Sequence, residues 1–218
     1  MQNSISNMKN RGVLLIFSKS PVPGQVKTRL IPGIGSRRAA TVYQDLLTRT
    51  LYAARRADFS AIQVWVDGNV SHRYFTRLKN RHYVKLYRQR GNDLGRRMFN
   101  TFNNALRNYP FAVLIGSDCP SLSNSDLQLA TEYLENKADV VLGPAIDGGY
   151  YLIGLRKNNH RLFSDIAWGK ATVLNDTCSR IKSLNLNLEL LSKRADLDRT
   201  SDLFSYFRMK RQESVLYY

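Results

Sequence analysis

The chain has 218 residues, 43% of them hydrophobic, and its 33 Lys and Arg against 17 Asp and Glu give a formal net charge of +16. This length and hydrophobic content suffice for one substantial core, and no apolar run is long enough to cross a bilayer. The two cysteines form no CxxC pair and no Cys/His cluster, which argues against a disulfide framework or a structural zinc site, so any metal must be held by oxygen.

The first predicted element is a strand at Gly12–Lys19, whose unbroken run of apolar residues is typical of a strand buried on both faces. A loop rich in proline and glycine follows over residues 20–35. A serine cap then opens a predicted helix from about Ser36 to Ala57. A strand, a loop of the size that holds phosphate and a helix therefore occur in this order.

Strands and helices alternate along the rest of the chain. Apolar runs predict strands at Ala61–Asp67, Tyr83–Tyr87, Phe111–Gly116, Asp139–Leu142, Tyr150–Leu155 and Leu186–Leu191. Helical periodicity predicts helices at Ser71–Lys79, Leu94–Arg107, Ser123–Asn136, Gly169–Leu184 and Thr200–Arg211. This alternation favours an α/β fold with a mostly parallel sheet covered on both faces. No linker divides the sequence, so we expect one domain over residues 1–218, with residues 1–10 and about 212–218 loosely ordered.

The loop after the first strand carries cationic side chains and loop amide groups suited to phosphate oxygens. Ligands of open parallel sheets bind beyond the carboxyl ends of the strands, which is where this loop begins. We therefore expect Lys19, Gly24, Lys27 and Arg29 to bind the phosphates of a nucleotide. The alternative is that these are ordinary surface charges in a turn shaped by proline.

A second candidate cluster lies at the strand-to-helix junction over residues 91–97. This junction could hold a base or ribose against its backbone groups, with Arg96 or Arg97 turned toward phosphate, and we take Asp93 and Arg96 as its candidate binding residues. The alternative, which is equally favoured, is that Asp93 only caps the helix that follows.

The third cluster follows the apolar strand at Phe111–Gly116, which delivers Asp118 to the same edge of the sheet. A carboxylate in this position suits Mg²⁺ or Mn²⁺, which prefer hard oxygen ligands and bridge phosphates. The alternative is that Asp118 caps the turn that leads into Cys119 and Pro120.

The fourth cluster, Asp147, Gly148, Gly149 and Tyr150, also follows an apolar strand. The two glycines allow a ligand to approach the backbone, and Asp147 could contact a sugar hydroxyl, bind metal or act as a base. Asp-Gly-Gly is also a strong signal for a hairpin turn, and both interpretations can hold together.

Two features later in the chain complete the candidate set. Trp168 could stack on a sugar or base, or be an ordinary core tryptophan. The acidic set Asp196, Asp198 and Asp202 offers a second metal ligand in Asp198, unless Asp198 caps the final helix.

Four segments in this order, PVPGQVKTRL, GNDLGRRM, IGSDCPSL and GPAIDGGYYLIGL, resemble a small bacterial glycosyltransferase-like family labelled as arsenosugar-biosynthesis glycosyltransferases. The resemblance spans about Val13 to Asp202. That family is similar to the nucleotide-diphospho-sugar transferases of GT-A fold, a Rossmann-like three-layer architecture also found in nucleotidyltransferases.

By this resemblance, Lys27 and Arg29 would meet the diphosphate and Asp118 would hold the metal. Asp118 stands where the Asp-x-Asp signature of the superfamily would begin. Here Pro120 replaces the second aspartate, so another carboxylate would have to complete the site.

The leading functional hypothesis is metal-dependent transfer of a glycosyl group from a nucleotide sugar to a small-molecule acceptor, with Mg²⁺ or Mn²⁺ as cofactor. Nucleotidyl transfer from a nucleoside triphosphate to a phosphorylated small molecule is the alternative. The positive charge also suggests a non-catalytic binder of nucleotide or nucleic acid, although no nucleic-acid-binding motif is present. The first eleven residues lack the apolar segment of a secretory signal, so we expect a cytoplasmic protein.

Overall fold

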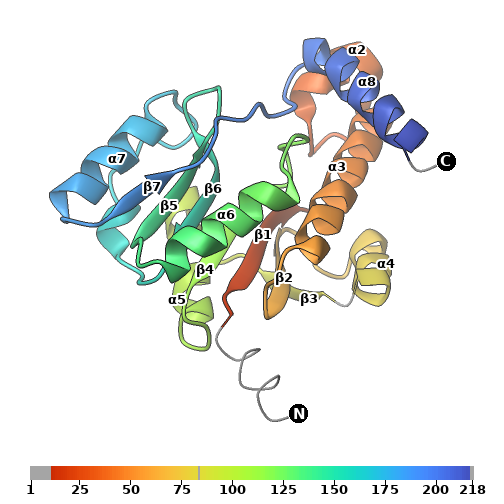
Figure 1. Cartoon of the computed structure of the whole chain (residues 1–218). Coiled ribbons are helices and arrows are strands. Elements are labelled where there is room, and N and C mark those ends of the chain that lie inside the picture. Colours follow the sequence, from red (N-terminus) through yellow and green to blue (C-terminus); the bar gives the residue numbers. More distant parts are fainter. Residues whose placement is uncertain (1–10, 83, 217–218) are drawn as a thin grey trace.

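The structure of the protein is a computed structural model that describes residues 11–82 and 84–216 (Figure 1). The predicted loose segment at residues 1–10 lies outside this range. In the described part of the chain, no helix combines the length and the apolar composition needed to span a membrane.

The centre of the fold is a seven-stranded sheet in the order β3-β2-β1-β4-β6-β5-β7. Its strands are β1 (Val13–Lys19), β2 (Ala61–Asp67), β3 (Lys85–Arg88), β4 (Ala112–Ile115), β5 (Val140–Pro144), β6 (Tyr150–Leu155) and β7 (Leu188–Leu190). All neighbouring strands are parallel except β6, which is antiparallel to both β4 and β5. The predicted α/β fold with a mostly parallel sheet is confirmed.

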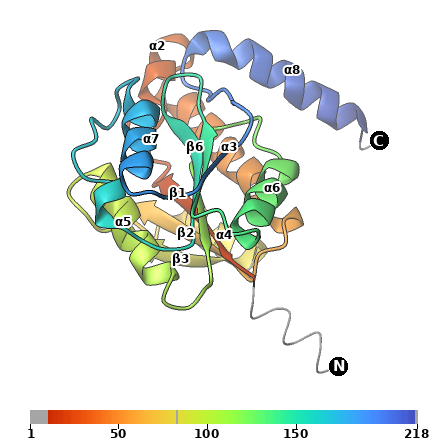
Figure 2. The same cartoon turned by 60° about the vertical axis from the view of Figure 1, so that its left-hand side comes forward.

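Helices cover both faces of this sheet, which gives three layers (Figure 2). The helices are α2 (Ile31–Ile34), α3 (Ser36–Arg56), α4 (Arg73–His82), α5 (Leu94–Ala105), α6 (Asn124–Glu135), α7 (Val173–Ser183) and α8 (Thr200–Leu216), with short 3₁₀ turns η1 (Thr28–Leu30) and η2 (His160–Leu162). The helix α8 continues to Leu216, beyond its predicted end at Arg211.

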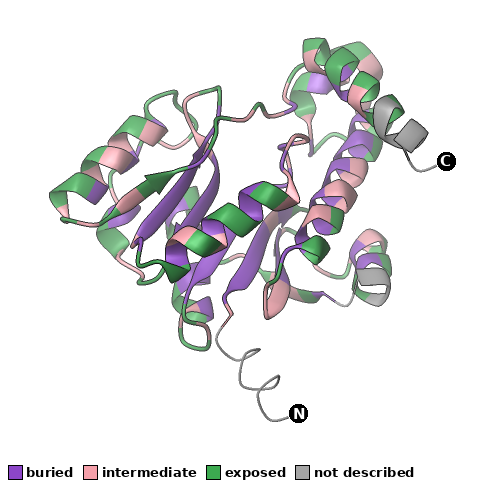
Figure 3. Cartoon of the chain, viewed as in Figure 1, coloured by how far each residue is buried: buried purple, intermediate pink, exposed green. Residues whose placement is uncertain are grey.

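The alternation of side chains along β1 explains why its sequence is continuously apolar. Leu14 and Ile16 pack against α3, α4 and α6, whereas Val13 and Leu15 pack against α5 and α7. Because successive side chains of a strand point to opposite faces, a central strand of a covered sheet must be apolar throughout. Figure 3 shows the central strands as the most buried part of the molecule.

A smaller apolar cluster joins the C-terminal helix α8 to α2 and α3. It is formed by the buried side chains of Leu30, Ala39, Val42, Leu46, Leu197, Leu203 and Tyr206. The cluster places α8 beside α2 and α3, at the end of the molecule that lies beyond the carboxyl edge of β1, as Figure 1 shows.

Two helix starts differ from their predictions for reasons of backbone geometry. The residue that precedes α3 is Gly35, with φ of 77°, and no side chain caps this helix, so the predicted serine cap is wrong. The helix α7 begins at Val173 and not at Gly169, because Gly169 has φ of 82°, outside the right-handed helical region. By contrast, the predicted helix at Ser123–Asn136 begins with a side-chain cap, since Ser123 caps α6 in a capping box with Asp126.

The same Asp126 also fixes the segment between β7 and α8. Its buried carboxylate accepts hydrogen bonds from the Ser123 backbone N–H at 2.9 Å and from the guanidinium of Arg194 at 2.8 Å. Asp126 therefore links the start of α6 to a segment that leads directly into residues 196–198.

We predict that Asp126→Asn lowers the free energy of unfolding by about 1–3 kcal/mol, because it removes a buried charge-assisted hydrogen bond and leaves Arg194 unpaired. Urea unfolding of the variant and the wild type measures the difference. The matched control is Asp165→Asn, whose exposed ion pair with Arg180 should contribute less than about 0.5 kcal/mol. Equal effects of the two substitutions would contradict the role given to Asp126.

Candidate active site

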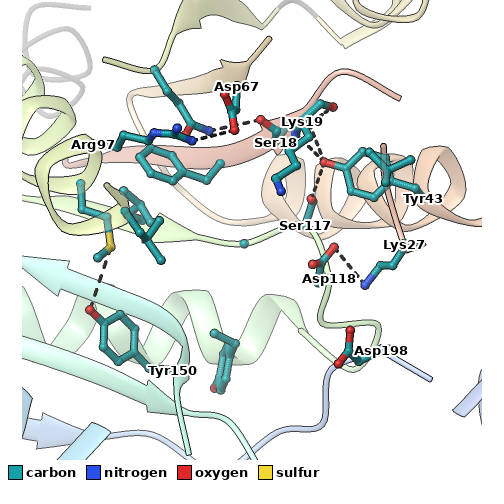
Figure 4. A pocket seen from close by; sticks show the side chains of 18 of the residues that line it. Ser18, Lys19, Lys27, Tyr43, Asp67, Arg97, Ser117, Asp118, Tyr150 and Asp198 are labelled. Atoms are coloured by element: carbon teal, nitrogen blue, oxygen red, sulfur yellow. Dashed lines mark hydrogen bonds and ion pairs between the residues drawn. The ribbon is translucent and has the colours of Figure 1, made fainter. Parts of the chain in front are cut away.

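A cleft of about 510 Å³ lies at the carboxyl ends of β1, β2 and β4 and the start of β6 (Figure 4). Its wall combines charged and aromatic side chains, among them Lys19, Lys27, Arg29, Tyr43, Asp67, Arg97, Asp118, Tyr150 and Asp198. This is the sheet edge at which open α/β folds bind their ligands.

The most unusual residue of the cleft is Lys27. Its backbone is left-handed, with φ of 48°, a conformation that is uncommon outside glycine. Its side chain is 4% exposed, and the ammonium lies 3.2 Å from Asp118 Oδ1 while also donating a hydrogen bond to the carbonyl oxygen of Leu197. The alternative of an ordinary surface charge is therefore wrong for Lys27, because the charge is buried and paired.

Asp118 follows β4 and points toward the cleft, as Figure 4 shows. Apart from Lys27, its Oδ1 has no hydrogen-bond partner among the described residues, while the side chain as a whole is 51% exposed. One oxygen thus neutralises the buried ammonium, and the carboxylate still reaches the space where a ligand would lie.

Arg29 and Asp198 form the outer rim of the cleft. Their side chains are paired with each other, and both residues line the cleft. Asp198 is not at the capping position of the final helix, because α8 begins at Thr200 and Arg199 directly precedes it. The Asp198 side chain pairs with Arg29, and Asp202 accepts hydrogen bonds from the backbone N–H groups of Asp198 and Arg199.

Asp196 joins these carboxylates, although sequence reasoning assigned it no role. The pKa of Asp196 is raised to about 6, chiefly by burial and then by the charges of Asp118, Asp147 and Asp198, against the lowering effect of Lys27. Aspartates from three separate loops thus share one electrostatic environment. The signal in the sequence was the short spacing of aspartates from residue 196 to residue 202.

The carboxylates do not form a preassembled metal cage. Among the residues that the structure describes, no group of three or more His, Cys, Asp or Glu is placed to hold a metal ion. A divalent ion at this edge would therefore need ligands from water or from a bound phosphate.

Tyr43, on the inner face of α3, is the other residue that sequence reasoning missed. Its hydroxyl accepts hydrogen bonds from the backbone N–H of Lys19 at 2.6 Å and from Ser117 Oγ at 3.1 Å. Because the hydroxyl has one proton, it donates to Ser18 Oγ at 3.0 Å. Burial raises the pKa of Tyr43, and the charge of Asp118 raises it further, which keeps the proton in place. Tyr43 thus ties the end of β1 to the end of β4.

Of the two arginines that could turn toward phosphate at residues 91–97, the structure places Arg97 in the cleft and Arg96 outside it. Leu94, Arg97 and Met98 line the cleft, and Arg97 pairs with Asp67 at 2.6 Å. Asp93 and Arg96 line a separate hollow of about 420 Å³, because residues one position apart in a helix point about 100° apart. The capping alternative for Asp93 is confirmed, since its Oδ1 accepts a hydrogen bond from the Arg96 N–H at 2.7 Å.

Trp168 is also away from the cleft. It lines the same separate hollow and packs against the core beneath α5. Trp168 therefore packs as a core tryptophan in this structure, and it is not placed to stack on a ligand in the main cleft.

The Asp-Gly-Gly segment forms the hairpin turn between β5 and β6. Asp147 Oδ1 accepts a hydrogen bond from the Gly149 N–H at 3.0 Å, and a Cβ on Gly148 would meet the carbonyl oxygen of Ala171 at 2.1 Å. Gly148 therefore makes room for a neighbouring loop. Among the described residues of this cluster, only Tyr150 lines the cleft. Gly24, which we predicted to bind phosphate from the loop after β1, is exposed and does not line the cleft either.

We predict that Tyr43→Phe lowers the free energy of unfolding by about 1–3 kcal/mol, because the Lys19 N–H and two serine hydroxyls lose a buried partner. Urea unfolding measures this loss, and Tyr109→Phe is the control, since the structure shows no hydrogen bond from that hydroxyl to a described residue. A loss of similar size in both variants would show that the hydroxyl network around Tyr43 does not matter.

Comparisons with known proteins agree with this architecture. A crystal structure from Desulfovibrio desulfuricans G20, provisionally described as a nucleotide-diphospho-sugar transferase, is 32% identical with a TM-score of 0.80, covering 87% of this chain and 83% of that chain. CMP:2-keto-3-deoxy-manno-octonic acid synthetase in complex with CTP gives a TM-score of 0.61 at 10% identity, covering 94% of this chain and 100% of the other.

The inositol-1-phosphate CTP transferase from T. maritima is similar at the same level, with a TM-score of 0.63, 13% identity and coverage of 93% of this chain and 96% of the other. At such low identity these two likenesses show the fold alone. No curated protein matches the sequence. Residues 50–170 match the family described as uncharacterized protein conserved in bacteria (DUF2064). Since that match spans more than half of the chain, the protein belongs to the DUF2064 family.

Proposed function

We propose that this chain is a single-domain transferase that binds a nucleotide-diphospho-sugar in the cleft and transfers its glycosyl group to a small-molecule acceptor. The observation that carries the proposal is the ion pair between the buried Lys27 ammonium and the half-exposed Asp118 carboxylate at the carboxyl edge of β1 and β4. Such a pair places a fixed cation and a fixed carboxylate where open α/β folds bind phosphate. The Desulfovibrio relative, at 32% identity, supports the same class of donor.

The basic side chains of the cleft would bind the diphosphate. Lys19 is exposed at the end of β1, and Arg29 reaches the rim. An arginine can make a two-pronged contact with phosphate, whereas lysine acts as a point charge. Arg29 would have to exchange part of its contact with Asp198 for the phosphate, which leaves Asp198 free to face the donor.

A divalent ion, Mg²⁺ or Mn²⁺, fits the chemistry of this donor set. Asp118 and Asp198 both line the cleft, and Mg²⁺ is usually held by one or two carboxylates together with substrate phosphates and water. The excess of negative charge around Asp196 favours a cation in this region. When bound, the ion would neutralise charge that develops on the departing diphosphate.

In the proposed reaction, the bond between the anomeric carbon and the diphosphate oxygen breaks, the acceptor hydroxyl forms a new bond to that carbon, and the proton of the hydroxyl passes to water or to a carboxylate. The electron pair leaves with the nucleoside diphosphate, where Lys19 and Arg29 stabilise it. Asp147 lies outside the lining of the cleft and is our candidate for contact with a part of the sugar or acceptor that extends beyond it, while Tyr150 would form the wall beside the sugar. We define the acceptor only by its hydroxyl. The family that the sequence resembles is labelled for arsenosugar biosynthesis, but the described residues of the cleft give no reason to prefer an acceptor that contains arsenic.

Nucleotidyl transfer is the second candidate. It is favoured by the fold shared with CMP:2-keto-3-deoxy-manno-octonic acid synthetase and inositol-1-phosphate CTP transferase. In that reaction an acceptor phosphate would attack the α-phosphorus of a nucleoside triphosphate and pyrophosphate would depart. The released product, nucleoside diphosphate or pyrophosphate, distinguishes the two reactions.

We predict that nucleoside diphosphates and one nucleotide sugar raise the melting temperature in the presence of Mn²⁺, and that Asp118→Asn removes the dependence on Mn²⁺. We expect Lys27→Met to lower turnover of the cognate donor at least about 100-fold, because it removes the ammonium that holds the Asp118 carboxylate in position beside the donor. Thermal shift and product analysis measure these effects, with circular dichroism to confirm folding.

The matched controls are Asp165→Asn and Lys170→Met, which remove the same charges at exposed positions away from the cleft. No shift with any nucleotide, at low salt and with metal present, would overturn the proposal. Steep salt-dependent binding of random oligonucleotides in that case would instead identify a nucleic-acid binder.

A further inference from the structure

The outward face of α8 has a composition that the packing of the protein does not explain. Phe204 is 78% exposed and Phe207 is 53% exposed, whereas soluble proteins usually bury at least part of such rings. Arg208 and Arg211 are also exposed and continue the same stripe at helical spacing. We call these four residues the α8 stripe.

The attachment of α8 to the protein does not use this stripe. Leu203 and Tyr206 are buried on the opposite side of the helix, against α2 and α3. The Tyr206 hydroxyl donates to Asp45, and Lys210 Nζ lies 2.9 Å from the same carboxylate. The inner face therefore fixes α8 by itself, and the two phenylalanines remain available for another contact.

The rings of the stripe lie on the same helix face as exposed arginines. Arg208 and Arg211 accompany them on α8 itself. Arg37 and Arg38 are exposed at the start of α3, and α2, α3 and α8 meet at the same end of the molecule (Figure 1). The carboxylate of Asp202, in the first turn of α8, accepts hydrogen bonds from two backbone N–H groups. Among the described residues, the stripe thus combines two apolar rings with two cations, in a chain whose formal net charge is +16.

We propose that the α8 stripe binds an anionic lipid surface. The convex outer side of a helix with two apolar rings and flanking arginines matches an interfacial helix, whose rings enter the boundary between headgroups and acyl chains while its cations meet lipid phosphates. A second copy of this chain is a poorer partner, because it would bring another strongly basic molecule against the stripe. Single-stranded nucleic acid is usually held in a groove lined by aromatic rings, and the stripe lies on a convex surface.

The test is co-sedimentation of the full chain with vesicles of pure phosphatidylcholine and with vesicles that contain about 30% phosphatidylglycerol, at physiological ionic strength. We expect binding to the anionic vesicles and little to the neutral ones. Phe204→Ser with Phe207→Ser should weaken binding at least about tenfold. Arg208→Gln with Arg211→Gln should weaken it by about 30-fold, as expected for two basic residues at the surface.

The charge-matched control is Arg156→Gln with Lys157→Gln, which removes two exposed cations after β6, and it should change binding less than about threefold. We expect nucleotides to raise the melting temperature of all these variants as much as that of the wild type, because the α8 stripe lies outside the cleft. This result would show that loss of vesicle binding is independent of the function of the cleft. Failure to bind anionic vesicles would overturn the proposal. An equal loss of vesicle binding in the control variant would also overturn it. So would tighter binding of oligonucleotides than of vesicles, or a dimer of the wild type that the Phe204→Ser substitution converts to a monomer.

Discussion

The contact on which the rest of the site depends is the buried ammonium of Lys27 between the carboxylate of Asp118 and the carbonyl oxygen of Leu197. A charge removed from water is destabilising unless it is paired and hydrogen-bonded. Each of its two partners therefore has to be held in place by other parts of the fold. The loop after β1, the loop after β4 and the segment before α8 can form this cleft only together.

The surrounding structure holds these partners on two sides. Tyr43 fixes the ends of β1 and β4 to one another through its hydroxyl. Arg194, held by Asp126, and Leu197, buried in the cluster with α8, fix the later segment. The cleft is thus held together by contacts within the protein, while Lys19 is exposed at its edge and Arg29 lies at its rim in a pair with Asp198.

The fold, and the location of the candidate site at one edge of the sheet, could both be predicted from the sequence. Both follow from the pattern of apolar strands along the chain. The strands β2 and β6 have the predicted ends, since each is an apolar run bounded by turn residues. Asp118 and Lys27 could be assigned to the site because parallel strands present their carboxyl ends at one edge. Asp93 and Arg96 were misplaced because the rotation of α5 about its axis is set by packing, and no local pattern specifies it. Tyr43 was missed for a related reason, since a tyrosine at helical spacing looks like an ordinary core residue.

The long sequence separation between Lys27 and Leu197 has a consequence for biosynthesis. During translation, β1 to β4 and the helices between them emerge well before residue 197, and domains generally fold from the N-terminal side. The Lys27 ammonium must stay hydrated, or pair with Asp118 alone, until the segment that contains Leu197 leaves the ribosome. The cleft is therefore completed later than the sheet, so that a nascent chain shorter than about 197 residues can acquire the sheet without acquiring the finished site.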